Sequence, residues 1–227
     1  MRVLKLVMGD IRFQWKYGFY IVYAIFTVVY LLVLASVPED VRRTVAAAMI
    51  FTDPAAMGLF FMGAIVLLEK SQHVNCAMVV SPVRVWEYCM AKLFSLALIG
   101  VVVAMILAVF GTIPKLASSL SGVLLSSFLC SACGLIAAMK SRTLNQFILL
   151  AAPFEMFICL PPILLLFHSN HPLLAVHPGI AAVWLIYGDA PSTALCLVSL
   201  IVWSIPALWL CVRTVKRNFL EMGGASI

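Results

Sequence analysis

Long apolar runs without charge are the feature of this sequence that most restricts its fold. The run from Gly18 to Val37 contains no charged side chain, and about 20 such residues in a helix cross the hydrocarbon of a bilayer. Over the whole chain, 64% of residues are hydrophobic and only 11% are charged. The sequence therefore predicts an all-α integral membrane protein with six transmembrane helices, because a spanning helix satisfies its own backbone hydrogen bonds. The other five runs are 44–68, 93–113, 116–139, 144–167 and 193–212.

The second run allows an alternative division. Asp53 before Pro54 is a helix-start signal, since the carboxylate can cap free N–H groups and proline suits the first helical turn. The crossing would then be confined to residues 54–69, with residues 44–52 forming a separate piece in the outer leaflet.

The N-terminal residues 1–17 combine two stripes at helical spacing. Val3, Val7, Ile11 and Trp15 share one face, with Leu4 and Met8 beside them, and the basic residues share another. This pattern predicts an amphipathic helix lying in the cytoplasmic interface of the membrane. Ordinary positive charge flanking a first span is the alternative interpretation of the basic residues.

The distribution of the 15 Lys and Arg residues predicts the orientation. Only Arg42, Arg43 and Lys115 lie on the outer side if the N-terminus is inside, and such asymmetry marks cytoplasmic loops rather than a nucleic-acid surface. We expect a multi-pass protein of the plasma membrane with both termini in the cytoplasm. The cytoplasmic basic residues are then Arg2, Lys5, Arg12, Lys16, Lys70, Arg84, Lys92, Lys140, Arg142, Arg213, Lys216 and Arg217.

Residues 69–92, here called the coupling segment, separate the second and third runs. Val74, Ala77 and Met78 fall on one face of a short helix. Ser81 followed by Pro82 predicts the cap and first residue of the next helix, which would carry Trp86 and Tyr88 through the headgroup region. A short cytoplasmic helix joined to a span is a shape on which a soluble partner can push.

The order of these features resembles the coupling region of type-2 ABC exporter permeases. The resemblance rests on Glu69-Lys70 ending a span, on Ser81-Pro82-Val83, on Trp86-Glu87-Tyr88 and on Lys92 opening the next span. Two further stretches, 53–70 and 144–162, resemble the subset of these permeases labelled fluoroquinolone exporters.

The resemblance implies a permease domain covering residues 1–227 that works as a homodimer or as paired permeases. Two copies of a separate ABC ATP-binding subunit would bind ATP and Mg²⁺, and this chain would bind no cofactor itself. Val74, Ala77 and Met78 would dock in a groove of the ATPase, and closure of the ATPase on ATP would move the helix that begins at Pro82 and so rock the spans.

Catalytic motifs are missing from the sequence. It has no glycine-rich phosphate loop ending in Gly-Lys-Ser or Gly-Lys-Thr, so hydrolysis of ATP by that mechanism must come from another polypeptide. It also has no Gly-x-Ser-x-Gly or His-Glu-x-x-His motif, which disfavours a membrane enzyme.

Asp53 and Glu155 are the acids that lie well inside apolar runs. A carboxylate at that depth is costly and indicates function by default. Glu155 either lines a substrate path or satisfies carbonyl groups freed by Pro153. For Asp53 the helix cap is the favoured interpretation, and the substrate path is the alternative.

The fourth run carries a small residue every four positions, which predicts a smooth ridge for close packing of another helix. The ridge consists of Gly122, Ser126, Cys130, Gly134 and Ala138. Cys130 and Cys133 form a Cys-x-x-Cys pattern, but an apolar helix favours packing over redox chemistry.

Residues 168–192 are too long for a turn and are predicted to form an extracellular loop. Apolar residues 180–187 predict a short re-entrant or surface helix within it. His168, His171 and His177 match no zinc spacing, so polar loop residues are the favoured interpretation and no metal site is predicted.

These observations predict a permease subunit that exports a small amphipathic compound of the drug, lipid or peptide class, using a separate ATPase. An ion- or proton-coupled carrier that uses Asp53 and Glu155 is one alternative. A membrane protein without transport activity, such as an immunity factor, is another.

Overall fold

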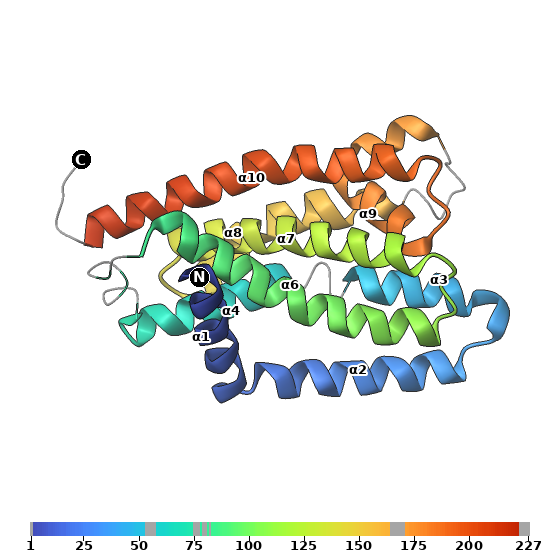
Figure 1. Ribbon diagram of the computed structural model, residues 1–227, viewed down its shortest axis with the longest axis horizontal. Helices are drawn as coiled ribbons and strands as arrows, with labels where there is room; N and C mark the ends of the chain where they lie inside the picture. The colour runs from blue at the N-terminus through green and yellow to red at the C-terminus, as the bar shows by residue number, and fades with distance from the viewer. Residues whose placement is uncertain are drawn as a thin grey trace.

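A computed structural model describes residues 2–52, 58–74, 78, 81, 83–163 and 171–222. Every regular element in these ranges is helical, so the all-α prediction is confirmed. The elements run mostly along one long axis (Figure 1). In chain order they are α1 Arg2–Lys16, α2 Phe19–Ser36, α3 Glu39–Ile50, α4 Gly58–Ser71, α6 Val85–Phe110, α7 Leu116–Lys140, α8 Leu144–Cys159, the 3-10 helix η3 Pro172–Val176, α9 Pro178–Tyr187 and α10 Thr193–Met222.

Five helices of the described chain are long and apolar enough to cross a membrane: α2, α6, α7, α8 with its extension to Ile163, and α10. They correspond to the first, third, fourth, fifth and sixth predicted spans. The boundaries of α7 agree with the prediction within one residue, whereas α10 continues ten residues past Val212. The extension contains no glycine or proline that would end a helix.

The second predicted span is divided between α3 and α4, which have 12 and 14 residues. The two helices follow one another along the long axis (Figure 1). Helix α3 begins at Glu39, earlier than the predicted piece at 44–52, because Glu39 and Asp40 place negative charge in its first turn, where the helix dipole is positive. In the part of the chain that the structure describes, the bundle thus has five helices long enough to cross a membrane, and two shorter helices in place of the second predicted span. Asp53 and Pro54 lie outside the described residues.

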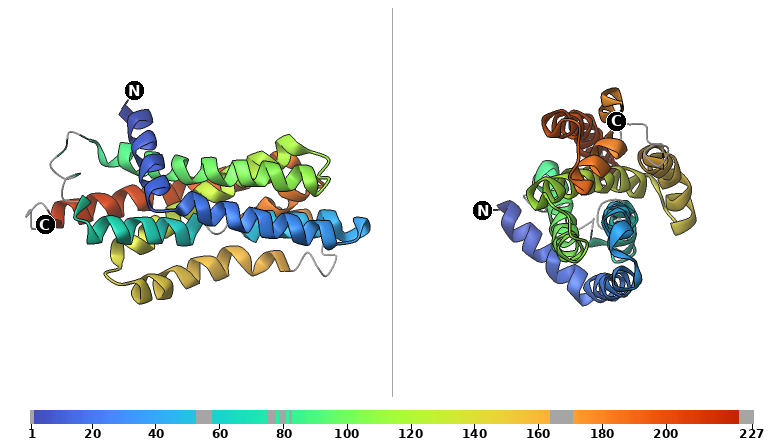
Figure 2. Two further views of the ribbon diagram at one scale, coloured as in Figure 1. Left: turned by 90° about the horizontal axis from the view of Figure 1, so that it is seen from below. Right: turned by 90° about the vertical axis from the view of Figure 1, so that its right-hand side faces the viewer.

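Helix α7 is the centre of the bundle (Figure 2), and 83% of its most apolar 18-residue stretch is buried. The predicted ridge is buried along its whole length. It faces two helices rather than one: a Cβ at Gly134 would overlap the Leu59 backbone of α4, and a Cβ at Gly122 would meet the Leu185 side chain of α9 at 2.8 Å. Small side chains therefore set the distance from α7 to both neighbours.

The predicted helix before the last span exists as α9, but it is not on the surface. Ile180, Ala181, Leu185 and Ile186 are all buried, and α9 packs between α7 and α10. Gly188 ends the helix with φ of 86°, a conformation in which glycine avoids the Cβ penalty.

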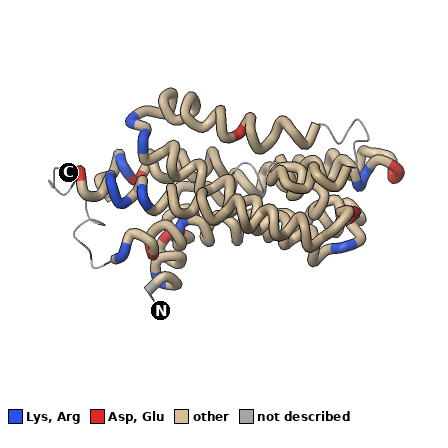
Figure 3. The backbone as a smooth tube through the Cα atoms, turned by 90° about the horizontal axis from the view of Figure 1, so that it is seen from above, with Lys and Arg blue, Asp and Glu red and all other residues tan. Residues whose placement is uncertain are grey.

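Lys and Arg residues gather at one end of the bundle (Figure 3). This basic end holds α1, the last turn of α4, the start of α6, the last turn of α7 and the last turns of α10. The opposite end holds the turn between α2 and α3, the turn between α6 and α7, and α9. The asymmetry expected from the sequence is therefore present in space.

Candidate functional site

The coupling segment opens with a tight turn and closes with a helix that starts later than predicted. Helix α4 ends at Ser71, and His73 has φ of 56°. Helix α6 begins at Val85, with Arg84 as its cap residue, so the prediction of a start at Pro82 is wrong by three residues.

The reason for the later start lies in two local hydrogen bonds. Glu87 accepts from the backbone N–H of Arg84 at 2.9 Å, which satisfies a free donor at the helix start. Ser81 Oγ instead donates backward to the Met78 carbonyl at 2.8 Å, so its hydroxyl closes the preceding turn. Ala77 and Pro82 lie outside the described residues.

Val74 and Met78 line a cavity of the bundle and are partly exposed. Both have helical backbone and are half-buried, and both line a cavity of about 210 Å³ together with Phe13, Tyr88 and Lys92. The docking of these residues on an ATPase stays a prediction. Within the described part of the segment, the exposed residues are Ser71, Gln72, His73, Arg84 and Trp86.

A buried group of charged and polar side chains, here called the Lys92 cluster, forms part of the wall of this cavity. The cluster consists of Asp10, Glu69, Tyr88, Lys92 and Ser95. Lys92 Nζ lies 2.5 Å from an Asp10 oxygen and 2.6 Å from a Glu69 oxygen, and the Lys92 side chain is only 3% exposed. Tyr88 donates to the second Glu69 oxygen at 3.1 Å. Buried charges are tolerated only when they are paired and hydrogen-bonded in this way.

Helix α1 adds further hydrogen bonds to the cluster. Ser95 Oγ donates to Asp10, and Gln14 Nε2 donates to Asp10 at 3.1 Å and to Ser95 Oγ at 2.9 Å. Tyr17, just past the end of α1, donates to Gln72 at 2.8 Å. The cluster therefore joins the two ends of the coupling segment, near Glu69 and Lys92, to α1.

Sequence reasoning missed the Lys92 cluster, although one signal was present. Val3, Val7, Asp10 and Gln14 recur at four-, three- and four-residue spacing, which places them on one face of α1. The expected apolar stripe is divided in space: Val7 is buried against the bundle, whereas Trp15 is 71% exposed. Helix α1 lies across the long axis of the bundle (Figure 1), so it presents one face to the bundle and an exposed apolar face to its surroundings.

Glu155 lies half-buried on α8, two residues after Pro153. Its carboxyl group makes no hydrogen bond or ion pair to any residue that the structure describes, so the carbonyl groups freed by Pro153 are not its partners there. The substrate-path interpretation of Glu155 stays a prediction.

The described histidines of the 168–192 segment act as helix caps. His171 Nδ1 accepts from Leu173 N–H at 3.4 Å, and His177 Nδ1 accepts from Gly179 N–H at 3.2 Å. Burial lowers the pKa of His177, and its ring packs 4.9 Å from that of Phe157. Among the described residues, no three His, Cys, Asp or Glu side chains are grouped so that they could hold a metal ion; His168 lies outside those residues.

The fold and the site together define a multi-pass helical membrane protein whose basic end connects a loop segment to the spanning helices through buried charges. Residues 1–216 match the Fluoroquinolones export permease protein family, and the chain belongs to that family. It is therefore a membrane-spanning permease of an export system.

Two curated proteins of Mycobacterium tuberculosis are similar to this chain. They are Fluoroquinolones export permease protein MT2761 of strain CDC 1551 / Oshkosh and Fluoroquinolones export permease protein Rv2687c of strain ATCC 25618 / H37Rv. Each is 29% identical over 159 residues, which is 64% of this chain and 67% of the relative.

Proposed function

We propose that this chain is the permease subunit of an ABC exporter and that a separate ATP-binding subunit supplies the energy. The chain has no phosphate-binding loop of its own, and its family consists of export permeases. The basic end would face the cytoplasm, where Lys and Arg concentrate in membrane proteins, so the coupling segment would lie on the side where ATP is found.

The observation that carries this proposal is the Lys92 cluster. A partner that pushes on the exposed residues Gln72, His73 and Arg84 would move Glu69 and Lys92, because Glu69 and Lys92 lie on α4 and α6 at the two ends of the segment. Asp10 would carry the same movement to α1 through its ion pair with Lys92. Rigid helices joined by a salt-bridge network are one kind of physical connection that can carry coupling between distant sites.

Val74 and Met78 take a modified role in this mechanism. They would seat the segment on the cavity in front of the Lys92 cluster, while the exposed side near Gln72, His73 and Arg84 meets the ATPase. Ala77, Ser81 and Pro82 remain candidate coupling residues of the same segment. Two permeases, identical or paired, would work with two ATPases, and ATP and Mg²⁺ would bind only to those partners.

The substrate is proposed to be a small amphipathic compound. A fluoroquinolone is the specific candidate, because the family and both relatives carry that name. Glu155 would face the compound on its path, where a carboxylate without a protein partner can meet a cationic or zwitterionic group.

The same observation on Glu155 supports a second candidate, an ion- or proton-coupled carrier. In that case Glu155, with Asp53, would bind and release the coupling ion, and no ATPase would be needed. Collapse of the proton gradient by a protonophore would then stop transport.

Co-purification tests the proposed partnership. The tagged chain is expressed from its native operon and purified in mild detergent, and we expect a soluble ATPase to purify with it. Arg84→Glu reverses an exposed charge of the coupling segment and should reduce the recovered ATPase. Arg12→Glu makes the same change on the exposed face of α1 and should not. Purification of the chain alone, with transport that needs no ATP, would contradict the proposal.

A further inference from the structure

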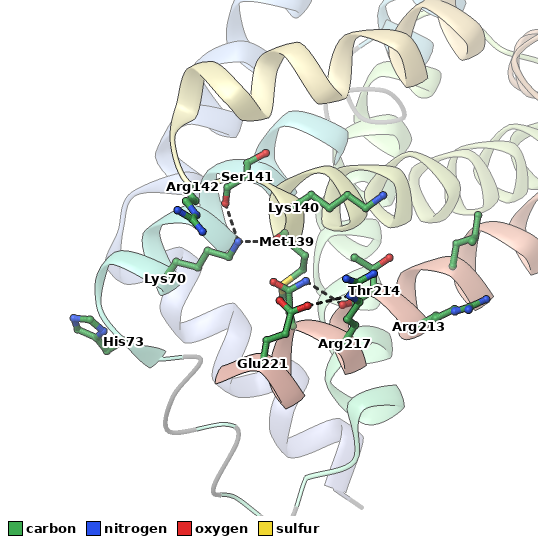
Figure 4. Close-up of a pocket in the computed structure, with 12 residues that line it drawn as sticks. Lys70, His73, Met139, Lys140, Ser141, Arg142, Arg213, Thr214, Arg217 and Glu221 are labelled. Atoms are coloured by element: carbon green, nitrogen blue, oxygen red, sulfur yellow. Dashed lines mark hydrogen bonds and ion pairs between the residues drawn. The ribbon is translucent and has the colours of Figure 1, made fainter. Parts of the chain in front are cut away.

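A cleft of about 740 Å³ opens at the basic end where α4, α7 and α10 end together (Figure 4). Five cationic side chains line it, from three helices and the α7–α8 turn, against one acid, Glu221. The cations are Lys70, Lys140, Arg142, Arg213 and Arg217. The lining therefore carries a large excess of positive charge in one concave site.

Two of these cations already have partners within the chain. Lys70 Nζ donates to the carbonyl groups of Ala138, Met139 and Ser141 at 2.7, 2.8 and 2.9 Å, so it caps the C-terminus of α7. Arg217 lies 3.0 Å from Glu221.

The remaining three, Lys140, Arg142 and Arg213, form no salt bridge with any carboxylate of the described chain. All three are exposed. Arg213 lies over the ring of Trp209, 5.2 Å from its centroid. The cleft thus has three cations available for an anionic group.

The basic cleft continues into apolar surface. A second cavity of about 420 Å³ shares Lys140 and Arg142 with it and extends along α8 past Leu149 and Leu150. Leu149 is 76% exposed. On the α10 side, Leu210 lines the cleft itself and is also exposed. An occupant with a negative head and apolar tails matches both parts of this surface.

We propose that the cleft binds the phosphate headgroup of an anionic membrane phospholipid, with the acyl chains lying on α8 and α10. Basic pockets between helices at this membrane face suit such headgroups. The general excess of positive charge in cytoplasmic segments does not require three unpaired cations to line one cavity, and Lys5, Arg12 and Lys16 of α1 lie at the same end outside it. An acidic protein surface would match the charge but not the apolar continuation.

Native mass spectrometry of the purified full chain tests this proposal. The probes are phosphatidylglycerol, phosphatidylcholine with the same acyl chains, and inorganic phosphate. The variant Arg142→Gln/Arg213→Gln removes two of the free cations, and Arg12→Gln/Lys16→Gln removes two exposed cations of α1 as the matched control. All four side chains are exposed, so both variants should fold.

We expect the chain to retain phosphatidylglycerol over phosphatidylcholine, and the cleft variant to lose about tenfold in that retention while the control keeps it. Equal retention in the cleft variant and the wild type would overturn the proposal. Binding of inorganic phosphate as strong as that of phosphatidylglycerol would also overturn it, since the site would then recognise the ion and not the lipid. If the cleft variant retains the lipid but no longer co-purifies with an ATPase, the proposal is overturned and the cleft is assigned to a protein contact instead.

Discussion

Each end of the bundle contains a cation that joins separate helices, but the surroundings of the two cations differ. At the basic end, Lys92 is buried between Asp10 and Glu69 and joins α6 to α1 and α4. At the opposite end, Arg43 of α3 donates to the Tyr187 carbonyl at 2.7 Å and to Asp189 at 2.6 Å, and Asp189 is 58% exposed.

The two ion pairs differ in the free energy that is lost when one partner is removed. Removing one partner of a buried ion pair costs about 3–5 kcal/mol, whereas an exposed pair contributes about 0–1 kcal/mol. Arg43 acts mainly as a cap on the last turn of α9, aided by its position 4.1 Å from the Tyr187 ring centroid. The Lys92 cluster sits beside the segment proposed to meet the ATPase, which is where rigid coupling is needed.

The largest effect is expected for Lys92→Met. This change leaves two carboxylates buried without their cation and should destabilise the fold by about 3–5 kcal/mol, or about 10 °C in thermal unfolding for a chain of this size. Thermal unfolding of the purified protein in detergent measures it.

A triple variant separates stability from coupling. Asp10→Leu/Glu69→Leu/Lys92→Met replaces the ionic groups by apolar ones, which is often neutral for stability. We expect it to regain most of the lost stability but not export. Full recovery of export would show that the cluster only holds the fold together, and an unchanged unfolding temperature in Lys92→Met would contradict the contrast itself.

The next effect concerns Met78→Asp, which places a carboxylate in the cavity beside Lys92. We expect the permease to remain folded and its complex to hydrolyse ATP, while export falls about tenfold or more, because the new acid competes for Lys92 and unseats the segment. Hydrolysis and export are measured on the same reconstituted complex, with Met78→Leu as the apolar control. Normal export by Met78→Asp would remove this segment from the mechanism.

A smaller effect is expected at the opposite end for Arg43→Gln. The exposed ion pair and the helix cap together should contribute about 1 kcal/mol, or about 2–4 °C, and export should be unchanged. Thermal unfolding and export assays on the same preparation check both statements. A loss larger than that of Lys92→Met would reverse the comparison of the two ends.

The smallest effect is a pH dependence from His177. Its neutral Nδ1 accepts the Gly179 N–H, and burial lowers its pKa, so the unfolded chain binds the proton more readily than the folded chain does. The contribution of neutral His177 to the free energy of unfolding should be present above the ordinary histidine pKa of about 6.5 and be lost as the pH falls below that value. We expect under about 1 kcal/mol.

His177→Asn keeps a capping side chain and removes the titration. The unfolding temperatures of the wild type and the variant are measured at pH 7.5 and at pH 5.5. We expect the drop in unfolding temperature from pH 7.5 to pH 5.5 to be smaller in the variant. An equal drop in unfolding temperature in both proteins would exclude His177 as the source of the pH dependence.

Local signals in the sequence predicted much of this fold. The lengths of the apolar runs predicted the positions of α2, α6, α7, α8 and α10. A helix in lipid makes its backbone hydrogen bonds within its own apolar run, so no distant residue is needed for the prediction. Thr143 illustrates local accuracy: its hydroxyl accepts from Gln146 N–H at 3.3 Å, so α8 begins at the predicted Leu144. The Ser81-Pro82 signal failed because a competing cap at Arg84 and Glu87 lay three residues further on.

The candidate site was less predictable because it depends on distant residues. Asp10, Glu69 and Lys92 are separated by 23 to 82 positions, so no local pattern in the sequence predicts that they meet. Val74 and Met78 also line a cavity whose other walls include α1 and α6, so this placement depends on how distant helices pack. Glu155, by contrast, is a prediction that needs only the sequence, since an acid inside an apolar run is already unusual.

Transport by the reconstituted complex tests the central claim most directly. The chain and its co-purified ATPase are placed in proteoliposomes, and movement of a fluoroquinolone is followed with and without ATP and Mg²⁺ and with a protonophore. We predict transport that requires ATP and Mg²⁺, is insensitive to the protonophore and is lost in Met78→Asp. Transport by the chain alone that collapses with the protonophore and is lost in Glu155→Gln would contradict this account and identify an ion-coupled carrier.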